Sequence, residues 1–254
     1  MPFGSSDGQA QLNGDAPWDD FDSAKYVEKN YIEVLSVDEE IMSIVRGHFS
    51  DHFRGLPNLP VHGIDVGAGA NLYPAFLMLP WCDRITLLDR SKTNRAYLRG
   101  QIEEHDGSWE KFWQKLCPDE AYAGFPDGPW PRLREVAQVK EGDILRPLDL
   151  PDNWQTGTMF FVAESISTDP EDFHRAVQHF LEALAPGAPF AAAFMEHSAG
   201  YQVGDLWFPA SNVDRTEIEA SIRRFTDSVR IHEIGEQGEV RTGYDYIILA
   251  CGFR

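Results

Sequence analysis

The sequence predicts an α/β protein built on an open, mostly parallel sheet, and three observations carry that prediction. The apolar segment 61–66 runs into Gly67-Ala68-Gly69, a glycine loop typical of the first strand end of a nucleotide-binding βαβ unit. About twenty residues further on, a second apolar run ends in Asp89, where that unit places an acidic ribose ligand. The segments 159–163 and 189–195 are apolar on both faces, as the central strands of a covered parallel sheet are.

The N-terminal part is predicted to be a tail followed by a helical cap. Residues 1–17 are polar and rich in Gly, Ser, Gln and Asp, so we expect them to be a disordered tail. Residues 18–56 contain an aromatic segment, a capping-box pattern at 36–39 and apolar residues at helical spacing, which predict two helices. The remaining residues, 57–254, are expected to form the sheet domain.

Helices and one insertion are expected between the early strands. The first helix spans 72–79, stops at Pro80 and is followed, after the strand 85–89, by a helix that begins near Asn94. Residues 104–134 carry several tryptophans and phenylalanines among prolines and glycines, which indicates a partly helical insertion. Its aromatic residues are expected to form a small core of their own, or to cover the active site. A strand follows at 136–141.

The C-terminal half completes a sheet of seven strands. Asp169-Pro170 is expected to cap a helix that ends at Pro186-Gly187, between the two apolar strands named above. The segments 229–234 and 244–250 flank the polar turn 235–238 and predict a hairpin. The sheet is therefore expected to end in an antiparallel C-terminal strand.

The composition excludes several classes of function. The 254-residue chain has a formal net charge of −19, whereas proteins that bind nucleic acid need a basic face. The cysteines, Cys82, Cys117 and Cys251, are odd in number and lack metal-ligand spacing, so we expect neither disulfides nor a metal site. Without a leader-like start or a membrane-length apolar run, we expect a cytoplasmic protein. The oligomeric state stays open between a monomer and a weak dimer.

The glycine loop departs from the dinucleotide pattern in two ways. Leu72 stands where the third glycine of that pattern belongs, and Asp65 would repel a phosphate at the loop. S-adenosylmethionine carries a sulfonium and an ammonium and has no phosphate, so it suits an acidic strand end better. The alternative is that Asp65 merely caps the turn.

The polar residues after the strands are candidates for adenosine binding, because open parallel sheets bind ligands at the carboxyl ends of their strands. Asp89 can accept hydrogen bonds from both ribose hydroxyls. Asn94 can support the ribose or the adenine, or it can cap a helix. Asp143 can accept the adenine amino group while Ile144 packs on the ring.

Two glutamates follow the apolar strands and are candidates for catalysis. Glu164 and Glu196 are expected to be partly desolvated, and such carboxylates can hold an amine or take its proton. Alternatively, they cap loops or pair with an arginine such as Arg175. His197, beside Glu196, is another possible base.

These motifs, taken in order, resemble the S-adenosylmethionine-dependent N-methyltransferases that act on nicotinamide, phenylethanolamine and indolethylamine, particularly their bacterial relatives. The resemblance runs from about Phe21 to the C-terminus. It is carried by residues 24–31, 64–69 with Tyr73, 89–94, 142–144 and 201–208.

The resemblance implies a Rossmann-like class I methyltransferase fold that uses S-adenosylmethionine. It implies that Tyr26 and Tyr31 close over the cofactor from the N-terminal cap, that Glu196 lies near the amine, and that Glu164 is a second acidic residue there. The cofactor residues on this interpretation are Tyr26, Tyr31, Asp65, Gly67, Ala68, Gly69, Tyr73, Asp89, Asn94, Asp143, Ile144 and Ala163. The substrate residues are Tyr26, Tyr201, Trp207 and Phe208.

The expected reaction is direct displacement at the sulfonium methyl, with Glu164 or Glu196 holding the acceptor or taking its proton. The aromatic residues favour a flat small-molecule acceptor, an amine or an indole, in secondary metabolism. Methylation of an indole carbon stays open. So do a cofactor-binding module without catalysis and, less favoured, an NAD-dependent oxidoreductase.

Overall fold

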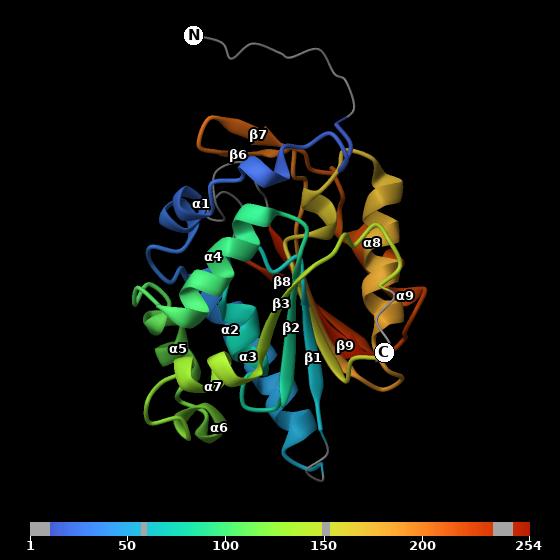
Figure 1. The fold of residues 1–254 in the computed structure, drawn as a ribbon. Helices are drawn as coiled ribbons and strands as arrows, with labels where there is room; N and C mark the ends of the chain where they lie inside the picture. The colour runs from blue at the N-terminus through green and yellow to red at the C-terminus, as the bar shows by residue number, and fades with distance from the viewer. Residues whose placement is uncertain (1–10, 57–59, 149–152, 236–245) are drawn as a thin grey trace.

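A seven-stranded sheet forms the centre of the computed structural model, which describes residues 11–56, 60–148, 153–235 and 246–254 (Figure 1). Its strand order is β3-β2-β1-β4-β5-β9-β8, and β9 is antiparallel to both of its neighbours while the other neighbours pair in parallel. The predicted α/β fold class is confirmed. The strands are β1 (His62–Val66), β2 (Arg84–Asp89), β3 (Ala137–Glu141), β4 (Thr156–Phe160), β5 (Pro189–Met195), β8 (Val229–Ile234) and β9 (Ile247–Phe253).

Helices cover both faces of the sheet because β5 is apolar on both sides. Ala191 and Ala193 face one core, while Phe190 and Phe194 face the other. The first core is covered by α1 (Ser23–Asn30), α2 (Ser36–Phe53), α3 (Tyr73–Met78), α4 (Lys92–Glu103) and the helices of the insertion; the second is covered by α8 (Pro170–Ala183) and α9 (Arg215–Arg223). None of the helices within the described ranges is long and apolar enough to cross a membrane.

Two predicted helix starts have different outcomes. Asp169 caps α8 by accepting a hydrogen bond from the Glu171 amide, and Pro170 takes the first helical position, as predicted. The capping box predicted for α2 is wrong, because Ser36 is already helical and Leu35 is the N-cap residue without a side-chain bond.

The fourth strand begins and ends earlier than its predicted range, 159–163. Phe161 has a φ of 61°, which ends the strand at Phe160, and a short 3-10 helix, η2 (Ala163–Ser165), follows. The strand begins at Thr156, whose buried hydroxyl donates a hydrogen bond to the Pro189 carbonyl. Ala163 therefore lies beyond the strand.

The C-terminal hairpin is formed by β8 and β9, and β9 runs three residues beyond the predicted end at residue 250. Residues 236–245, which include most of the predicted turn and the first residues of the predicted strand 244–250, lie outside the described residues. The strands β6 (Tyr201–Val203) and β7 (Leu206–Phe208) form a second antiparallel hairpin, which the sequence analysis did not predict.

The predicted insertion, 104–134, contains three short α-helices, α5 (Glu110–Leu116), α6 (Glu120–Ala123) and α7 (Trp130–Val136), the last of which ends two residues beyond it. The expectation that its aromatic residues form a small core of their own is wrong, because they join the core on the α2 and α3 face of the sheet. Phe76 of α3 packs edge-on against both Trp113 and Trp130. The insertion is thus part of the main packing of the protein.

The predicted tail, 1–17, lies only partly within the described residues. Residues 1–10 lie outside them, but residues 11–17 have defined contacts and lead into the 3-10 helix η1 (Trp18–Asp20). Asn13 is 5% exposed and its amide donates to Asp143. Residues 11–17 depart from the prediction because hydrogen bonds hold Asn13 in place, and a low apolar content does not reveal such bonds.

The packing of the insertion on α3 gives a stability prediction. Phe76→Ala removes a fully buried ring between two tryptophans and should lower the free energy of unfolding by about 3–5 kcal/mol in urea titrations. Ile32→Ala, at a position that is 61% exposed, is the control and should change it by less than about 0.5 kcal/mol. Equal effects of the two variants would contradict the packing described here.

Candidate active site

A cavity lies at the carboxyl ends of β1, β2, β3 and β4, where the strand order reverses between β1 and β4. Such a reversal opens a crevice that α/β proteins use for ligands. The floor of the cavity comes from the loops after these strands, and its roof comes from the N-terminal segment. The lining residues are 66–71, 88–91, Asn94, 142–144, 160–162 and 165–166 from the sheet side, with Asn13, Trp18, Phe21, Tyr26, Tyr31 and Tyr201 above.

The glycine loop after β1 leaves no room for a side chain at its first position. Gly67 has a φ of +63°, and an added Cβ would lie 2.6 Å from the Val162 side chain. The loop is tied to the neighbouring strand by a hydrogen bond of 3.0 Å from the Ala68 amide to the Leu88 carbonyl. Gly67, Ala68 and Gly69, which the sequence analysis expects to hold the cofactor, all line the cavity.

Asp89 lies at the end of β2 as a buried, oriented carboxylate that lines the cavity. It accepts hydrogen bonds of 2.7 Å from the amides of Gly69 and Ser91. Burial raises the pKa of Asp89 to about 6, although these bonds lower it. Its Oδ1 also accepts a long hydrogen bond of 3.5 Å from Asn94 Nδ2, whereas Oδ2 keeps a further lone-pair direction and can still accept from a ligand hydroxyl.

Asp65 lies behind the loop and is not a lining residue of the cavity. Its Oδ1 accepts a 2.7 Å hydrogen bond from the Thr158 hydroxyl, and its Oδ2 has no partner within the described part of the chain. Burial, with a smaller effect from the charge of Asp89, raises the pKa of Asp65 to about 8. In the ligand-free protein this carboxyl is therefore mostly protonated at neutral pH, and a nearby cation would lower its pKa.

Asn71 is a lining residue that the sequence analysis missed. It is 8% exposed, its Oδ1 accepts from the Tyr73 amide, and its Nδ2 has no hydrogen-bond partner among the described residues. A buried amide without a partner costs free energy unless a ligand or water completes it. Asn71 is thus placed to donate to an oxygen of a bound molecule.

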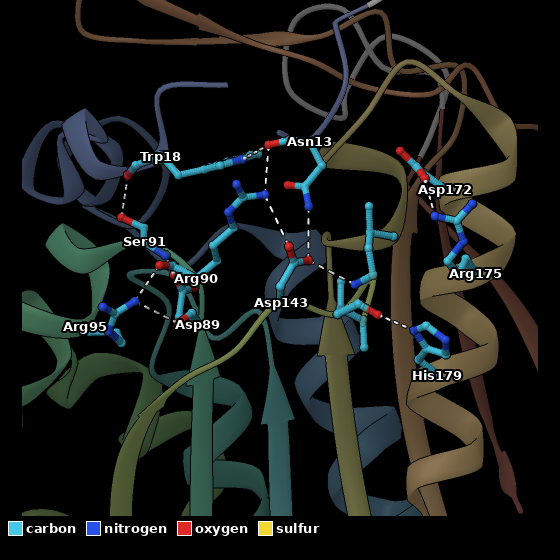
Figure 2. Close-up of polar contacts among 12 residues, drawn as sticks. Asn13, Trp18, Asp89, Arg90, Ser91, Arg95, Asp143, Asp172, Arg175 and His179 are labelled. Atoms are coloured by element: carbon cyan, nitrogen blue, oxygen red, sulfur yellow. Dashed lines mark hydrogen bonds and ion pairs between the residues drawn. The ribbon is translucent and has the colours of Figure 1, made fainter. Parts of the chain in front are cut away.

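Asp143 and Ile144 line the cavity beyond the end of β3, as predicted. Asp143 accepts hydrogen bonds from Asn13 Nδ2 at 3.1 Å and from Arg90 Nη1 at 3.3 Å, as Figure 2 shows. His179 holds the backbone of this loop, because its Nδ1 donates to the Ile144 carbonyl at 2.7 Å (Figure 2).

The N-terminal segment is bonded directly to the residues that follow β2. Ser91 donates from its hydroxyl to the Trp18 carbonyl, and Arg90 donates to the Asn13 carbonyl (Figure 2). Ser23 donates to Asn94 Oδ1 at 2.8 Å. Asn94 is not the helix cap, because Ser91 fills that position in α4. The roof of the cavity is therefore bonded to the part of the floor that follows β2.

Three tyrosines predicted to bind the cofactor have two different environments. Tyr26 and Tyr31 line the cavity from the N-terminal cap. Tyr73 is fully buried, stacks on Phe112 and donates its hydroxyl to Asp38 at 3.4 Å, so it lies one layer behind the wall. Of the predicted cofactor residues, Ala163 is likewise buried away from the lining residues.

A second cavity adjoins the first and shares the wall residues Tyr26, Phe161, Ser165 and Tyr201 with it. Trp207, which is 55% exposed, lines this second cavity together with Lys29, Asn30, Met195, Gly200 and Gln202. Phe208 lines neither cavity: it is fully buried and stacks on Tyr201, so it supports the wall instead of forming it.

The structure does not bring the two predicted catalytic glutamates to the lining of either cavity. Glu164 is fully buried in η2 and accepts a 3.0 Å hydrogen bond from the amide of Met195, which lines the second cavity. Burial raises the pKa of Glu164 to about 7, opposed mainly by the hydrogen bond from the Met195 amide, and Oε2 has no partner among the described residues. Glu196 accepts a 2.8 Å hydrogen bond from the Arg215 amide at the start of α9, which matches the capping alternative.

Comparison with known proteins agrees with this geometry. The model of the NNMT/PNMT/TEMT family matches residues 9–246. The chain belongs to this family. The bovine phenylethanolamine N-methyltransferase is 26% identical over 173 residues, which are 64% of this chain and 61% of that protein, and the human one is 24% identical over 176 residues, 66% and 62% respectively. The match thus spans less than two thirds of the length of these relatives.

Solved structures with this fold include methyltransferases of low sequence identity. The N-methyltransferase NodS from Bradyrhizobium japonicum, in complex with S-adenosyl-L-homocysteine, superposes with a TM-score of 0.51 at 12% identity, covering 91% of this chain and 98% of that one. An S-adenosylmethionine-dependent methyltransferase from Clostridium acetobutylicum gives a TM-score of 0.54 at 9% identity, covering 90% and 96%. The Rossmann-like class I methyltransferase fold is confirmed.

S-adenosylmethionine is the cofactor of this family, and the first cavity fits it. Asp89 offers a carboxylate for the ribose hydroxyls, and Asn71 offers an amide hydrogen for a carboxylate oxygen. Arg90, the one basic lining residue in the described chain, is paired with Asp143, so no free cation is provided for a phosphate. The fit therefore favours this cofactor over a dinucleotide.

The raised pKa of Asp65 predicts the direction of a pH effect on stability. The folded protein binds more protons than the unfolded chain between about pH 4 and pH 8, so this group makes the free energy of unfolding fall as the pH rises through that range. Asp65→Asn keeps the oxygen that accepts from Thr158 and should remove this contribution. Urea titrations of the ligand-free proteins at pH 5 and pH 8 should therefore show a smaller loss for the variant. Equal losses in the two proteins would contradict the buried, protonated state.

Proposed function

We propose that this protein transfers a methyl group from S-adenosylmethionine to a nitrogen atom of a small, flat acceptor. The observation that carries the proposal is the wall shared by the two cavities, to which Tyr26, Phe161, Ser165 and Tyr201 contribute. A donor in the first cavity and an acceptor in the second meet at these residues. Family membership supports methyl transfer as the reaction.

The cofactor, when bound, supplies an electrophilic methyl group on a sulfonium. The acceptor nitrogen forms the new N–C bond as the S–C bond breaks, and the bonding electron pair stays on sulfur. The protein needs no covalent nucleophile for such a displacement, so its contribution is to align the two molecules and to exclude water. Phe21, Tyr26 and Tyr31 in the roof serve that exclusion, since they close the first cavity from the N-terminal segment.

Holding the donor is assigned to the residues of the first cavity. Asp89 accepts from the ribose hydroxyls, Asp143 accepts from the adenine amino group, and Ile144 packs against the ring. For Asp143 to do so, the adenine must share its carboxylate with Asn13 and Arg90 or displace one of them. Asp65 acts from behind the loop, where a sulfonium or an ammonium would stabilise its charged form.

Glu164 is the stronger candidate of the two glutamates for removing the proton from the methylated nitrogen. Its Oε2 has no hydrogen-bond partner among the described residues, and the next residue in the chain, Ser165, lines the shared wall; we assign to the Ser165 hydroxyl the passage of the proton from the acceptor to Glu164. A pKa of about 7 suits a base that works near neutral pH. Glu196 is engaged at the start of α9, which supports a positioning function there.

The setting of the reaction follows from composition. A net charge of −19 disfavours a nucleic-acid substrate, and the described cysteines Cys82, Cys117 and Cys251 are free thiols, as in a reducing compartment. We therefore propose a cytoplasmic enzyme that modifies a small molecule.

Transfer from methyl-labelled donor to a panel of small amines, indoles and other nitrogen heterocycles tests the proposal. Labelled N-methyl product, identified by mass spectrometry, is the expected result, and product labelled on carbon would show the alternative, ring methylation. Donor binding in calorimetry without transfer to any acceptor would indicate a cofactor-binding module instead.

The two glutamates make a matched pair for kinetics. With an acceptor that loses a proton, Glu164→Gln should lower kcat by about 100-fold and abolish the decline of kcat/KM below about pH 7. Glu196→Gln, which keeps an oxygen for the Arg215 amide, should change kcat by less than about threefold. Unchanged kcat in the Glu164 variant would remove this residue from the mechanism.

A further inference from the structure

The second cavity is unusual for this acidic protein because its only charged lining residue in the described chain is a lysine. Lys29 belongs to α1, which lies beside the β6–β7 hairpin (Figure 1). The other lining residues are neutral, and they include the indole of Trp207. Among the described residues, the formal charge that lines this cavity is therefore positive.

No carboxylate of the described residues lines this cavity beside Lys29. Glu164 and Glu196 lie outside the lining of the second cavity, and each accepts a hydrogen bond from a backbone amide. Lys29 has no carboxylate within ion-pair distance among the described residues, whereas Lys25 on the same helix pairs with Asp22 at 3.4 Å. An ammonium group bound beside Lys29 would meet a like charge.

The Lys29 side chain is exposed, and its ammonium makes one hydrogen bond and still has hydrogens to donate. Its Nζ donates to the Gln202 carbonyl on β6 at 3.2 Å, which uses one of its three hydrogens. The second cavity has two parts. One part is the wall shared with the first cavity, and the other part, which the first cavity does not share, includes Lys29, Gln202 and Trp207.

We propose that the acceptor is a flat heteroaromatic molecule bearing a carboxylate, with its reacting ring nitrogen at the shared wall and its carboxylate on Lys29. The ring packs against Trp207, whose indole is held by close contact with the Gly200 backbone, where an added Cβ would lie 2.7 Å from Nε1. Lys29 is thereby a specificity-determining residue. The inference rests on the proposed function for the reaction, but it concerns binding and is testable by itself.

Binding of matched acceptors to the protein saturated with S-adenosyl-L-homocysteine tests the inference. One set is imidazole-4-acetate, 4-ethylimidazole and histamine, and the other is indole-3-acetate, 3-ethylindole and tryptamine, so that each ring carries an anionic, a neutral and a cationic group. Calorimetry should show that the carboxylate member of at least one set binds about five- to tenfold more tightly than the amine.

Lys29→Gln should abolish that preference while the neutral member binds as before. Lys25→Gln is the matched control, because Lys25 lies on the same helix, does not line the cavity and should leave the preference unchanged. Tighter binding of the amine, no binding of either carboxylate, or an equal effect of Lys29→Gln on all members would overturn the inference. Failure of the proposed function would give a different result, since methyl transfer would then be absent whichever of the acceptors binds most tightly.

Discussion

The burial of carboxyl groups beside the glycine loop is the constraint on which the rest of the site depends. Asp65, Asp89 and Glu164 are each at most 6% exposed, and burial raises the pKa of all three. A buried carboxylate is stable only where hydrogen bonds or positive charge replace water. The amides of Gly69, Ser91 and Met195 and the Thr158 hydroxyl supply those bonds, and they also fix where each carboxyl group points.

Hydrogen bonds also connect the roof of the first cavity to its floor. Asn13, Trp18 and Ser23 of the N-terminal segment bond to residues just after β2 and β3. Closing the roof therefore uses the same loops that hold adenosine in the proposed complex. The insertion supports this arrangement from behind, since Trp109 and Phe112 pack against Tyr31 of the roof.

The sequence predicts well what depends on local pattern and much less what depends on contacts between distant segments. The glycine loop, Asp89, Asp143 and the strands β5 and β8 follow from short-range spacing and are where the sequence predicts them. The capping bond from Glu196 to Arg215 and the place of Tyr73 behind the wall depend on tertiary packing. Asn13 and Lys29 carried no signal, because polar residues in a short N-terminal segment look the same whether they are solvated or bonded. Asn71 could have been found from its position, because it is a polar residue two positions after Gly69 in the same loop.

The central claim is that the first cavity holds the donor with its reactive end at the wall shared with the second cavity. A crystal structure of the protein with S-adenosyl-L-homocysteine measures this most directly. The account predicts density for the ligand with the ribose on Asp89, the adenine between Asp143 and Ile144, and the sulfur facing the shared wall that includes Tyr26 and Ser165. Density only outside this cavity, or a ligand whose sulfur faces away from that wall, would contradict it.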